Sequence, residues 1–314
     1  MPDVIRWGRT AYETDESLAL ERQHAERLGL TWAMYDSLTD EPDFEGVGAL
    51  VIPSKVHITR SVIERFAGSL VLTTTSGYDH IDISAARRTG IRVARCPMAR
   101  RDPVVEHAVA CAMMLMRRTD VLQRAATTGH WARADLPGLA GRAIAGARVL
   151  IVGMGMIGQR MAEVLRVLGA DVCACDPVGL PAAVTAADLA LDLPRTDLLT
   201  LHCSLTSTSR NWLNAEKLDQ LPAHAVVVNT ARGDVMDVAA AVDRVRDGRL
   251  RGVACDVFPT EPYPSLKTAA SVPGVILSPH AAGYVHDLGL RVADEVGRNL
   301  AAWVAGEALP GAIA

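Results

Sequence analysis

The chain has 314 residues, which at about 150 residues per domain favours two domains. Hydrophobic residues make up 49% of it and charged residues 22%, a composition that excludes an intrinsically disordered chain. Lys plus Arg total 32 and Asp plus Glu total 36, so the net charge is −4, and no basic block is present. We therefore expect neither a nucleic-acid partner nor a membrane partner.

The sequence also favours a cytoplasmic protein. No run approaches the roughly 18 apolar residues of a membrane-spanning helix, and the first residues lack the basic and then apolar layout of a signal peptide. The six cysteines stand singly, mostly within apolar runs, and no further metal ligands lie near them. We expect buried free thiols and no metal site.

Short apolar runs alternate with helical stretches over the first hundred residues, which predicts a parallel sheet with crossover helices. The predicted strands are residues 4–7, 32–35, 49–52, 70–73 and 92–94, and the predicted helices are residues 16–28, 59–67 and 83–89.

A longer helix is predicted over residues 103–118, with Pro103 near its first turn and Arg117 and Arg118 at its end. It is apolar almost all round, so we expect it to be buried on every side. Residues 120–145 are punctuated by glycines and one proline, Pro137, which predicts an irregular arm.

The alternation of strands and helices resumes after the arm and is typical of a doubly wound sheet. The fold class is therefore α/β, with two Rossmann-like or flavodoxin-like doubly wound parallel-sheet domains. The strands are predicted at residues 148–152, 171–175, 198–202, 225–229, 252–257 and 275–278, and a last helix at residues 288–303.

Gly153-Met-Gly155-Met-Ile-Gly158 follows a predicted strand and opens a predicted amphipathic helix, the arrangement of a dinucleotide-binding turn. The first glycine permits the tight turn, the second admits a pyrophosphate, and the third lets helix and strand pack closely. Free N–H groups at the helix start suit the phosphates. A glycine-rich turn that binds nothing is the less favoured alternative.

Asp176 ends the next strand, 23 residues after the first glycine, close to the expected spacing of about 20. Its carboxylate can accept both hydroxyls of a ribose and would repel a 2′-phosphate. The sequence therefore predicts NAD rather than NADP as the cofactor.

Arg232, Glu261 and His280 each follow a predicted strand of the second block, so their side chains can face one crevice at the carboxyl edge of the sheet. Arg232 can hold a carboxylate and polarise a ketone. His280 can donate a proton to the ketone oxygen, and Glu261 can hydrogen-bond the other imidazole nitrogen. Asp256 is placed to accept a hydrogen bond from a nicotinamide carboxamide. Taken singly, Arg232, Glu261 and His280 are each more often ordinary side chains in a surface ion pair, a turn or solvent, and their occurrence at three successive strand ends favours the site.

These motifs resemble the D-isomer-specific 2-hydroxyacid dehydrogenase family over residues 55–306. The resemblance is carried by Gly77-Tyr-Asp-His-Ile-Asp82, Val105-Glu-His107, the Gly153 turn, Asn229-Thr-Ala-Arg-Gly233, Asp256-Val-Phe-Pro-Thr-Glu-Pro262 and Pro279-His280. It implies that Arg232, Glu261 and His280 are catalytic and that Asp256 contacts nicotinamide. It further implies that backbone N–H groups at Ser76 and Gly77 bind the substrate carboxylate, and that Lys55 can reach the substrate.

The cofactor contacts that we predict lie at the turn, the strand ends and the loops that follow them. They are Gly153, Gly155, Met156, Ile157, Gly158, Asp176, His202, Cys203, Thr230, Ala231, Asp256 and Gly283. Two departures from the family pattern stand out. Ser204 stands where the family usually has a proline, which could change the fit of the cofactor. Arg100 and Arg101 could recognise an additional anionic group on the substrate. They could also be solvated at the domain edge, and this second alternative is favoured.

The resemblance predicts an NAD-dependent 2-ketoacid reductase or D-2-hydroxyacid dehydrogenase acting on a small anionic substrate. We expect a substrate domain of residues 1–98 plus 286–314, into which an NAD-binding domain of residues 99–285 is inserted. The family further implies a homodimer, with the 120–145 arm as a candidate contact. The main alternative is an NAD(H)-sensing, protein-binding module of the corepressor type. A formate dehydrogenase is disfavoured because that related family pairs its histidine with glutamine.

Overall fold

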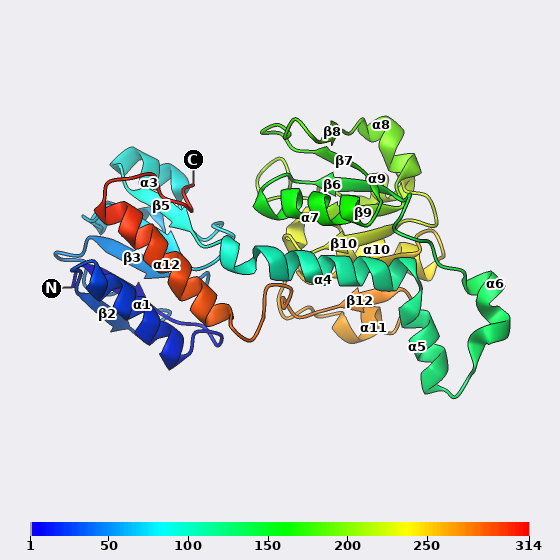
Figure 1. Ribbon diagram of the computed structural model, residues 1–314, viewed down its shortest axis with the longest axis horizontal. Helices are drawn as coiled ribbons and strands as arrows, with labels where there is room; N and C mark the ends of the chain where they lie inside the picture. The colour runs from blue at the N-terminus through cyan, green and yellow to red at the C-terminus, as the bar shows by residue number, and fades with distance from the viewer. Residues whose placement is uncertain (1, 314) are drawn as a thin grey trace. The chain divides into compact units, whose positions relative to one another are not determined.

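The computed structural model describes residues 2–313, and the chain packs into two compact units (Figure 1). Unit 1 consists of the residues up to Arg100 together with those from Tyr284 onward. Unit 2 is the continuous segment Arg101–Gly283, so it is inserted into unit 1. The boundaries expected from the sequence were 98/99 and 285/286.

Unit 1 is built on a five-stranded sheet with the order β2-β1-β3-β4-β5, in which every pairing is parallel. This is the flavodoxin-like doubly wound order. The strand bounds are β1 Val4–Trp7, β2 Trp32–Tyr35, β3 Ala49–Ile52, β4 Leu70–Thr73 and β5 Arg92–Arg95.

Alternate residues of each strand point to opposite faces of this sheet, and helices cover the hydrophobic side chains on both faces. Val51 and Leu72 share a core with Leu300 of α12, whereas Leu50 and Val71 share one with Ile63 of α2. The helices of this unit are α1 Asp15–Arg27, α2 Arg60–Arg65, α3 Ile83–Thr89 and α12 Leu288–Val304.

Unit 2 contains a seven-stranded sheet with the order β12-β11-β10-β9-β6-β7-β8, again parallel throughout. The order reverses between β6 and β9, which makes their carboxyl ends the topological switch point of a Rossmann fold. The strands are β6 Arg148–Val152, β7 Asp171–Cys175, β8 Thr185–Ala186, β9 Leu198–Leu201, β10 Val226–Asn229, β11 Gly252–Cys255 and β12 Val275–Leu277.

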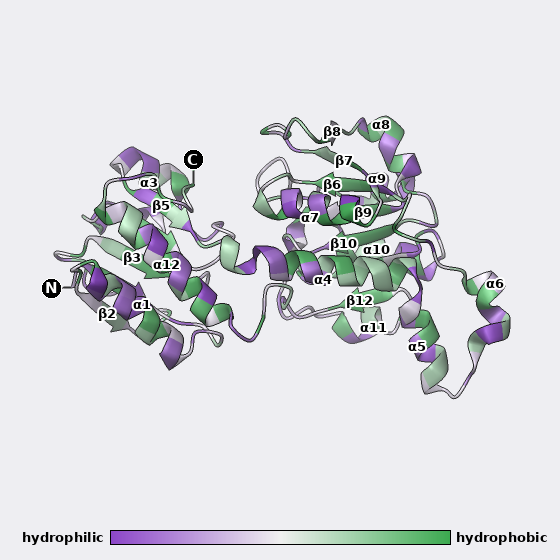
Figure 2. Cartoon of the chain, in the orientation of Figure 1, coloured by the Kyte–Doolittle hydropathy of each residue, from purple (hydrophilic) through white to green (hydrophobic). Residues whose placement is uncertain are grey.

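The strands of the second sheet are strongly hydrophobic, as Figure 2 shows, because both faces are covered. Ile151 and Val228 share a core with Met161 of α7, whereas Leu150 and Val227 share one with Val242 of α10. The helices are α7 Met156–Val167, α8 Leu189–Asp192, α9 Ala215–Gln220, α10 Val238–Arg246 and α11 Leu266–Ala270. The predicted fold class is confirmed, and the short strand β8 was not foreseen.

Helix α4 spans Met98–Met116 and begins five residues before the predicted start, so the placement of Pro103 in the first turn was wrong. The helix starts early because Glu295 of α12 accepts hydrogen bonds from the N–H groups of Met98 and Ala99, at 3.0 and 2.8 Å. A carboxylate in this position satisfies two of the N–H groups that a helix start leaves free.

The expectation that this helix is buried on every side was also wrong. One face of α4 is buried in unit 2 through Ala108, Ala112 and Leu115, whereas Met114 on the opposite face is 41% exposed. The apolar sequence therefore leaves an exposed hydrophobic stripe rather than a helix enclosed by the protein.

The predicted arm contains regular structure in place of an irregular chain. It holds α5 Thr119–Thr127, a 3-10 turn η1 Ala132–Asp135 and α6 Leu136–Leu139, and none of these elements has a buried residue. Figure 1 shows the arm projecting away from the seven-stranded sheet. Trp131 lies on it and is 87% exposed.

All six cysteines are free thiols, four of them buried. Among residues 2–313, no group of His, Cys, Asp and Glu side chains could hold a metal ion. Over the same residues, none of the helices combines the length and the hydropathy needed to cross a bilayer.

Candidate active site

The glycine-rich turn joins β6 to α7 at the switch point of the seven-stranded sheet. A Cβ on Gly153 would lie 2.5 Å from the backbone nitrogen of Cys203, and one on Gly158 would lie 2.0 Å from the carbonyl oxygen of Gly153. A Cβ on Gly155, by contrast, would meet no atom within 4 Å. The first and third glycines are thus required by packing inside the protein, and the second faces open space.

Helix α7 opens directly after this turn, with Gly155 as its N-cap and Met156 and Ile157 as its first residues. Gly155 makes no side-chain capping bond, so the first N–H groups of the helix remain available to an anion. Asp176 follows β7 and holds the turn from the other side. Its carboxylate accepts from the N–H of Met154 at 2.7 Å and from that of Val178 at 2.8 Å.

His202 and Cys203 follow β9, and Thr230 and Ala231 follow β10. The Nε2 atom of His202 lies 2.9 Å from Oγ1 of Thr200, and burial lowers the pKa of this imidazole to about 4. Its Nδ1 atom and the hydroxyl of Thr230 are buried and have no hydrogen-bond partner among residues 2–313. Buried polar atoms of this kind are the ones that a bound ligand satisfies.

Arg232 lies in the loop after β10, whose shape depends on the fully buried Asn229. The Asn229 side chain accepts from the N–H of Ala231 and donates to the carbonyl of Arg232, both at 3.0 Å. Gly233 then passes so close to the next loop that a Cβ would lie 1.9 Å from the carbonyl carbon of Phe258. The loop of Arg232 is therefore packed directly on the loop that carries Glu261.

Glu261 and His280 form a hydrogen-bonded pair. Oε2 of Glu261 lies 2.9 Å from Nδ1 of His280, while Oε1 accepts from the N–H of Phe258 at 3.0 Å. The backbone of His280 has φ +56°, a left-handed conformation that is uncommon outside glycine. The imidazole is 54% exposed, so its Nε2 side remains accessible to a substrate.

Asp256 fixes the loop that carries His280. Its buried carboxylate accepts from the hydroxyl of Ser278 at 2.6 Å and from the N–H groups of Ala281 and Ala282 at 2.8 and 2.9 Å. The carbonyl of Asp256 accepts from the N–H of His280 at 2.8 Å. The sequence predicted a nicotinamide contact for Asp256, and the structure adds a loop-holding role that the sequence did not reveal.

His107 of α4 extends this network, because its Nε2 atom lies 3.1 Å from the hydroxyl of Ser278. Ser278 donates its hydrogen to Asp256, so it can accept one from His107. The sequence analysis assigned no role to either residue. The position of Ser278, two residues before His280 at the end of β12, was the available signal.

Unit 1 carries the other predicted site residues at the carboxyl edge of its own sheet. Ser76 and Gly77 follow β4, and Lys55 lies in an exposed turn after β3. The carbonyl of Ser76 accepts from Arg95 at 3.0 Å and that of Gly77 from Thr75 at 2.9 Å. The N–H groups of Ser76 and Gly77 have no acceptor among residues 2–313. Gly283 is the last residue of unit 2.

Comparison with protein families gives one match, to the D-isomer specific 2-hydroxyacid dehydrogenase, NAD binding domain, over residues 109–282. More than half of the chain is covered. The chain belongs to the D-isomer-specific 2-hydroxyacid dehydrogenase family. It is accordingly an NAD-dependent oxidoreductase, and unit 2 contains the NAD-binding domain.

Individual members of the family are similar along most of their length. A glyoxylate reductase from Thermofilum pendens is 32% identical over 248 residues, which are 77% of this chain and 73% of the relative. An (S)-sulfolactate dehydrogenase from Chromohalobacter salexigens is 30% identical over 255 residues, 79% of this chain and 81% of the relative. The apo D-lactate dehydrogenase of Escherichia coli superposes with a TM-score of 0.73 at 25% identity, over 99% of both chains.

The residues at the switch point fit NAD. Gly155 leaves space for a pyrophosphate beside the start of α7, and the unpartnered atoms of His202 and Thr230 lie in the loops after the neighbouring strands. Asp176 accepts two N–H hydrogen bonds, and a carboxylate has about four acceptor positions. It therefore retains capacity for ribose hydroxyls.

Proposed function

We propose that the protein is an NAD-dependent 2-ketoacid reductase, or in the reverse direction a D-2-hydroxyacid dehydrogenase, in which His280 exchanges the proton. The observation that carries the proposal is the 2.9 Å pair of His280 and Glu261. Glu261 lies in the loop after β11 and His280 in the loop after β12 of the NAD-binding sheet, and the loop of Glu261 packs against the loop of Arg232.

Arg232 is proposed to orient the substrate. Its planar guanidinium can bind the carboxylate and the ketone oxygen of a 2-ketoacid together, and its charge polarises the ketone. The side chain is half-buried, and Nη1 of its guanidinium donates to the carbonyl of Ala231 at 2.8 Å, which restrains the guanidinium. An orientation that is fixed before the substrate arrives reduces the entropic cost of reaching the transition state.

His280 is proposed to be the general acid in reduction. Glu261 accepts the Nδ1–H of the imidazole, so Nε2 is the nitrogen that carries the transferable proton. NADH, when bound, supplies the hydride for C2 of the ketoacid. His280 delivers a proton from Nε2 to the ketone oxygen, which becomes the hydroxyl, and in oxidation it takes that proton back.

Unit 1 is proposed to be the substrate domain and unit 2 the cofactor domain. The free N–H groups of Ser76 and Gly77 are suited to the substrate carboxylate, since backbone N–H groups in a tight loop bind anions. Lys55 is exposed after the neighbouring strand and can add a positive charge.

The cofactor contacts are proposed at the residues predicted from the sequence. Asp176 would hold the adenosine ribose, and the start of α7 would hold the pyrophosphate. Asp256 would contact the nicotinamide carboxamide with the acceptor capacity that Ser278, Ala281 and Ala282 leave to it.

A homodimer is proposed through the arm and the exposed stripe of α4. Trp131 and Met114 are both large, apolar and exposed on unit 2. Exposed hydrophobic patches of this kind commonly mark protein–protein interfaces.

The test is NADH oxidation by the purified protein with a panel of 2-ketoacids at neutral pH. The panel includes glyoxylate, pyruvate, hydroxypyruvate and 2-ketoacids with larger side chains. Each assay is repeated with NADPH. We expect reduction of at least one acid with NADH and loss of that activity in Arg232→Gln. If NADH binds tightly and no acid is reduced, the NAD(H)-sensing module takes the place of this proposal.

A further inference from the structure

Arg100 and Arg101 stand side by side in the sequence but have different partners. Nη2 of Arg101 lies 2.9 Å from Oδ2 of Asp102, and its Nε lies 3.2 Å from the other carboxylate oxygen. The same carboxylate also pairs with Arg160, at 3.0 Å. Arg100, in contrast, has no carboxylate within ion-pair distance among residues 2–313. The structure therefore separates an ion-paired arginine from one whose charge has no direct counter-ion.

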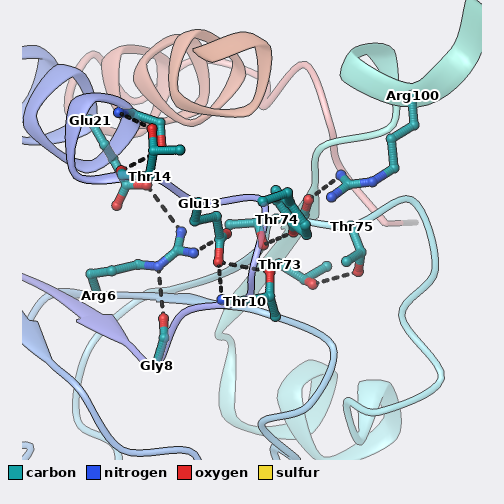
Figure 3. Close-up of polar contacts among 12 residues, drawn as sticks. Arg6, Gly8, Thr10, Glu13, Thr14, Glu21, Thr73, Thr74, Thr75 and Arg100 are labelled. Atoms are coloured by element: carbon teal, nitrogen blue, oxygen red, sulfur yellow. Dashed lines mark hydrogen bonds and ion pairs between the residues drawn. The ribbon is translucent and has the colours of Figure 1, made fainter. Parts of the chain in front are cut away.

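The guanidinium of Arg100 is nevertheless held in place. Its Nη1 atom donates to the carbonyl of Thr74 at 2.5 Å, as Figure 3 shows, and its Cζ lies 4.7 Å from the ring centroid of Tyr12. The hydroxyl of Tyr12 lies 3.3 Å from that of Thr74. The arginine is half-buried, so the donors that Thr74 does not use remain accessible.

A second arginine reaches the same loop. Arg95, at the end of β5, donates to the carbonyl of Ser76 and lies with its Cζ 5.5 Å from the ring centroid of Tyr78. Burial lowers the pKa of Arg95, and this arginine too lacks a carboxylate within ion-pair distance over the described residues. Two partly buried cations therefore contact residues 74–78.

The nearby carboxylates are occupied elsewhere. Glu295 uses its two oxygens to cap the start of α4. Glu13 and Glu21 form ion pairs with the fully buried Arg6, and Glu13 also accepts two hydrogen bonds from Thr10 (Figure 3). The charge of Glu295 still acts on Arg95 and Arg100 at longer range, but neither arginine has a carboxylate within ion-pair distance among residues 2–313.

The free donors of this loop lie close to one another. Arg100 contacts Thr74, and the free N–H groups belong to Ser76 and Gly77. Three residues of chain limit the separation of the Cα atoms of Thr74 and Gly77 to about 10 Å. That span suits a three- or four-carbon acid that has an anionic group at each end. One anionic group can accept a hydrogen bond from Arg100 and the other from the N–H groups of Ser76 and Gly77. The hydroxyl of Ser76 is also buried and without a partner among residues 2–313, so it adds a donor.

We propose that Arg100 binds a second anionic group of the substrate, so that the preferred substrates are small 2-ketoacids carrying a carboxylate, sulfonate or phosphate at the end remote from the keto acid. In this arrangement the N–H groups of Ser76 and Gly77 bind the carboxylate beside the ketone. Arg95 stabilises the loop through its hydrogen bond to the carbonyl of Ser76. The inference rests on the proposed reductase function and names the substrate class for it.

The test compares kcat/KM with NADH for matched acids that differ in the second anionic group. Suitable pairs are pyruvate with oxaloacetate or 3-sulfopyruvate, and hydroxypyruvate with its 3-phosphate. For the wild-type protein we expect the dianionic acid of a pair to be preferred by about 10-fold or more. Arg100→Gln should lower kcat/KM for the dianionic acid by about 10- to 100-fold, the effect of removing a charge-assisted hydrogen bond, and leave the monoanionic acid within about 3-fold.

Two further variants separate recognition from structural support. Arg101→Gln, the neighbouring arginine already paired with Asp102, should leave the ratio of the two acids unchanged. Arg100→Lys keeps the charge and loses the planar guanidinium, so it should retain part of the preference. If Arg100→Gln lowers kcat/KM equally for both acids, or leaves the ratio unchanged, the anion-binding role is wrong. If the wild-type protein reduces neither acid of any pair although it binds NADH, the reductase function itself fails.

Discussion

His280 occupies a backbone conformation that few non-glycine residues adopt, and hydrogen bonds to Asp256 and to the carbonyl of Ser278 hold it there. Asp256 accepts from the N–H groups of His280, Ala281 and Ala282, with its carbonyl for the first and its carboxylate for the other two. The direction of the imidazole is therefore set by the loop before any substrate binds. Preorganisation of this kind is what proton transfer in an enzyme requires.

Replacing His280 with alanine should slow turnover by about 100-fold or more, because the ketone oxygen loses its proton donor. The affinity for NADH should change little, since the side chain is exposed and is not among the proposed cofactor contacts. Steady-state kinetics with the best acid of the panel and fluorescence titration with NADH measure the two effects. A variant with the wild-type rate would show that another group supplies the proton.

Replacing Asp176 with alanine should weaken the use of NADH far more than that of NADPH, because the carboxylate that accepts the ribose hydroxyls is lost. The turn also loses the hydrogen bond from the N–H of Met154, so a modest decrease with both cofactors is expected. The informative quantity is the ratio of kcat/KM for NADH and NADPH. Equal losses with the two cofactors would assign Asp176 to loop support alone.

His202 should make the protein sensitive to acid. Its pKa of about 4 lies below the ordinary value of 6.5, so between these values the unfolded chain binds the proton and the folded protein does not. The free energy of unfolding should therefore fall as the pH drops from about 6.5 towards 4, by up to about 1.4 kcal/mol per pH unit. Urea titrations at pH 7 and 4.5 measure this, with His202→Gln as the comparison. The variant should lose less stability than the wild type, and equal losses would contradict the assignment.

Residues that follow a strand and carry charge could be found from the sequence, because strand ends in parallel sheets meet at one edge. Arg232, Glu261 and His280 belong to this group, and the structure brings Glu261 and His280 within hydrogen-bond distance. The link from Asp256 through Ser278 to His107 could not be found this way. It depends on a contact between α4 and the loop after β12, 171 residues apart in the chain.

At the scale of single elements, the glycines of the glycine-rich turn have different roles, because some are required by packing inside the protein and one by the ligand. Gly153 and Gly158 have no space for a side chain, whereas Gly155 faces an open region. The motif therefore combines two positions that the fold requires with one that a ligand requires. A sequence pattern alone treats the three as equivalent.

Gly155→Ala should leave the thermal stability nearly unchanged and weaken NADH binding, because its Cβ occupies the space of the pyrophosphate. Gly153→Ala should destabilise the protein by roughly 1–3 kcal/mol, since the new Cβ clashes with Cys203 and the backbone has φ +95°. Calorimetry and NADH titration of both variants test the distinction. If Gly155→Ala bound NADH as the wild type does, the pyrophosphate would have to lie elsewhere.

Two wrong predictions concern α4, whose surroundings come from distant parts of the chain. The start of α4 depends on Glu295, which lies nearly 200 residues later, so local signals placed it at Pro103. The exposure of Met114 could not be foreseen either, because an apolar helix indicates burial without saying what covers it. Strands were located well because each is a short buried run between turns.

At the scale of the whole molecule, the arm is the proposed contact of the homodimer. If the homodimer forms through it, the wild-type protein should sediment at about twice the 33.5 kDa of one chain. Trp131→Asp places a charge on the most exposed tryptophan of the arm and should shift the protein to the monomer. Analytical ultracentrifugation over a range of concentrations gives the answer. A dimer that persists in Trp131→Asp would mean that another surface forms the contact, and a monomeric wild type would exclude the dimer.

The insertion of unit 2 also sets the order in which the protein can be completed during synthesis. Unit 2 is one continuous segment, so all of it has been made when Gly283 is added. Unit 1 must wait for α12, whose Leu288, Val296 and Leu300 cover the sheet face lined by Val4, Val51 and Leu72. Until α12 has left the ribosome, that hydrophobic face of the unit 1 sheet stays uncovered. Unit 1 is thus completed only after unit 2 has been synthesised, and its uncovered sheet is the surface that a chaperone would need to shield.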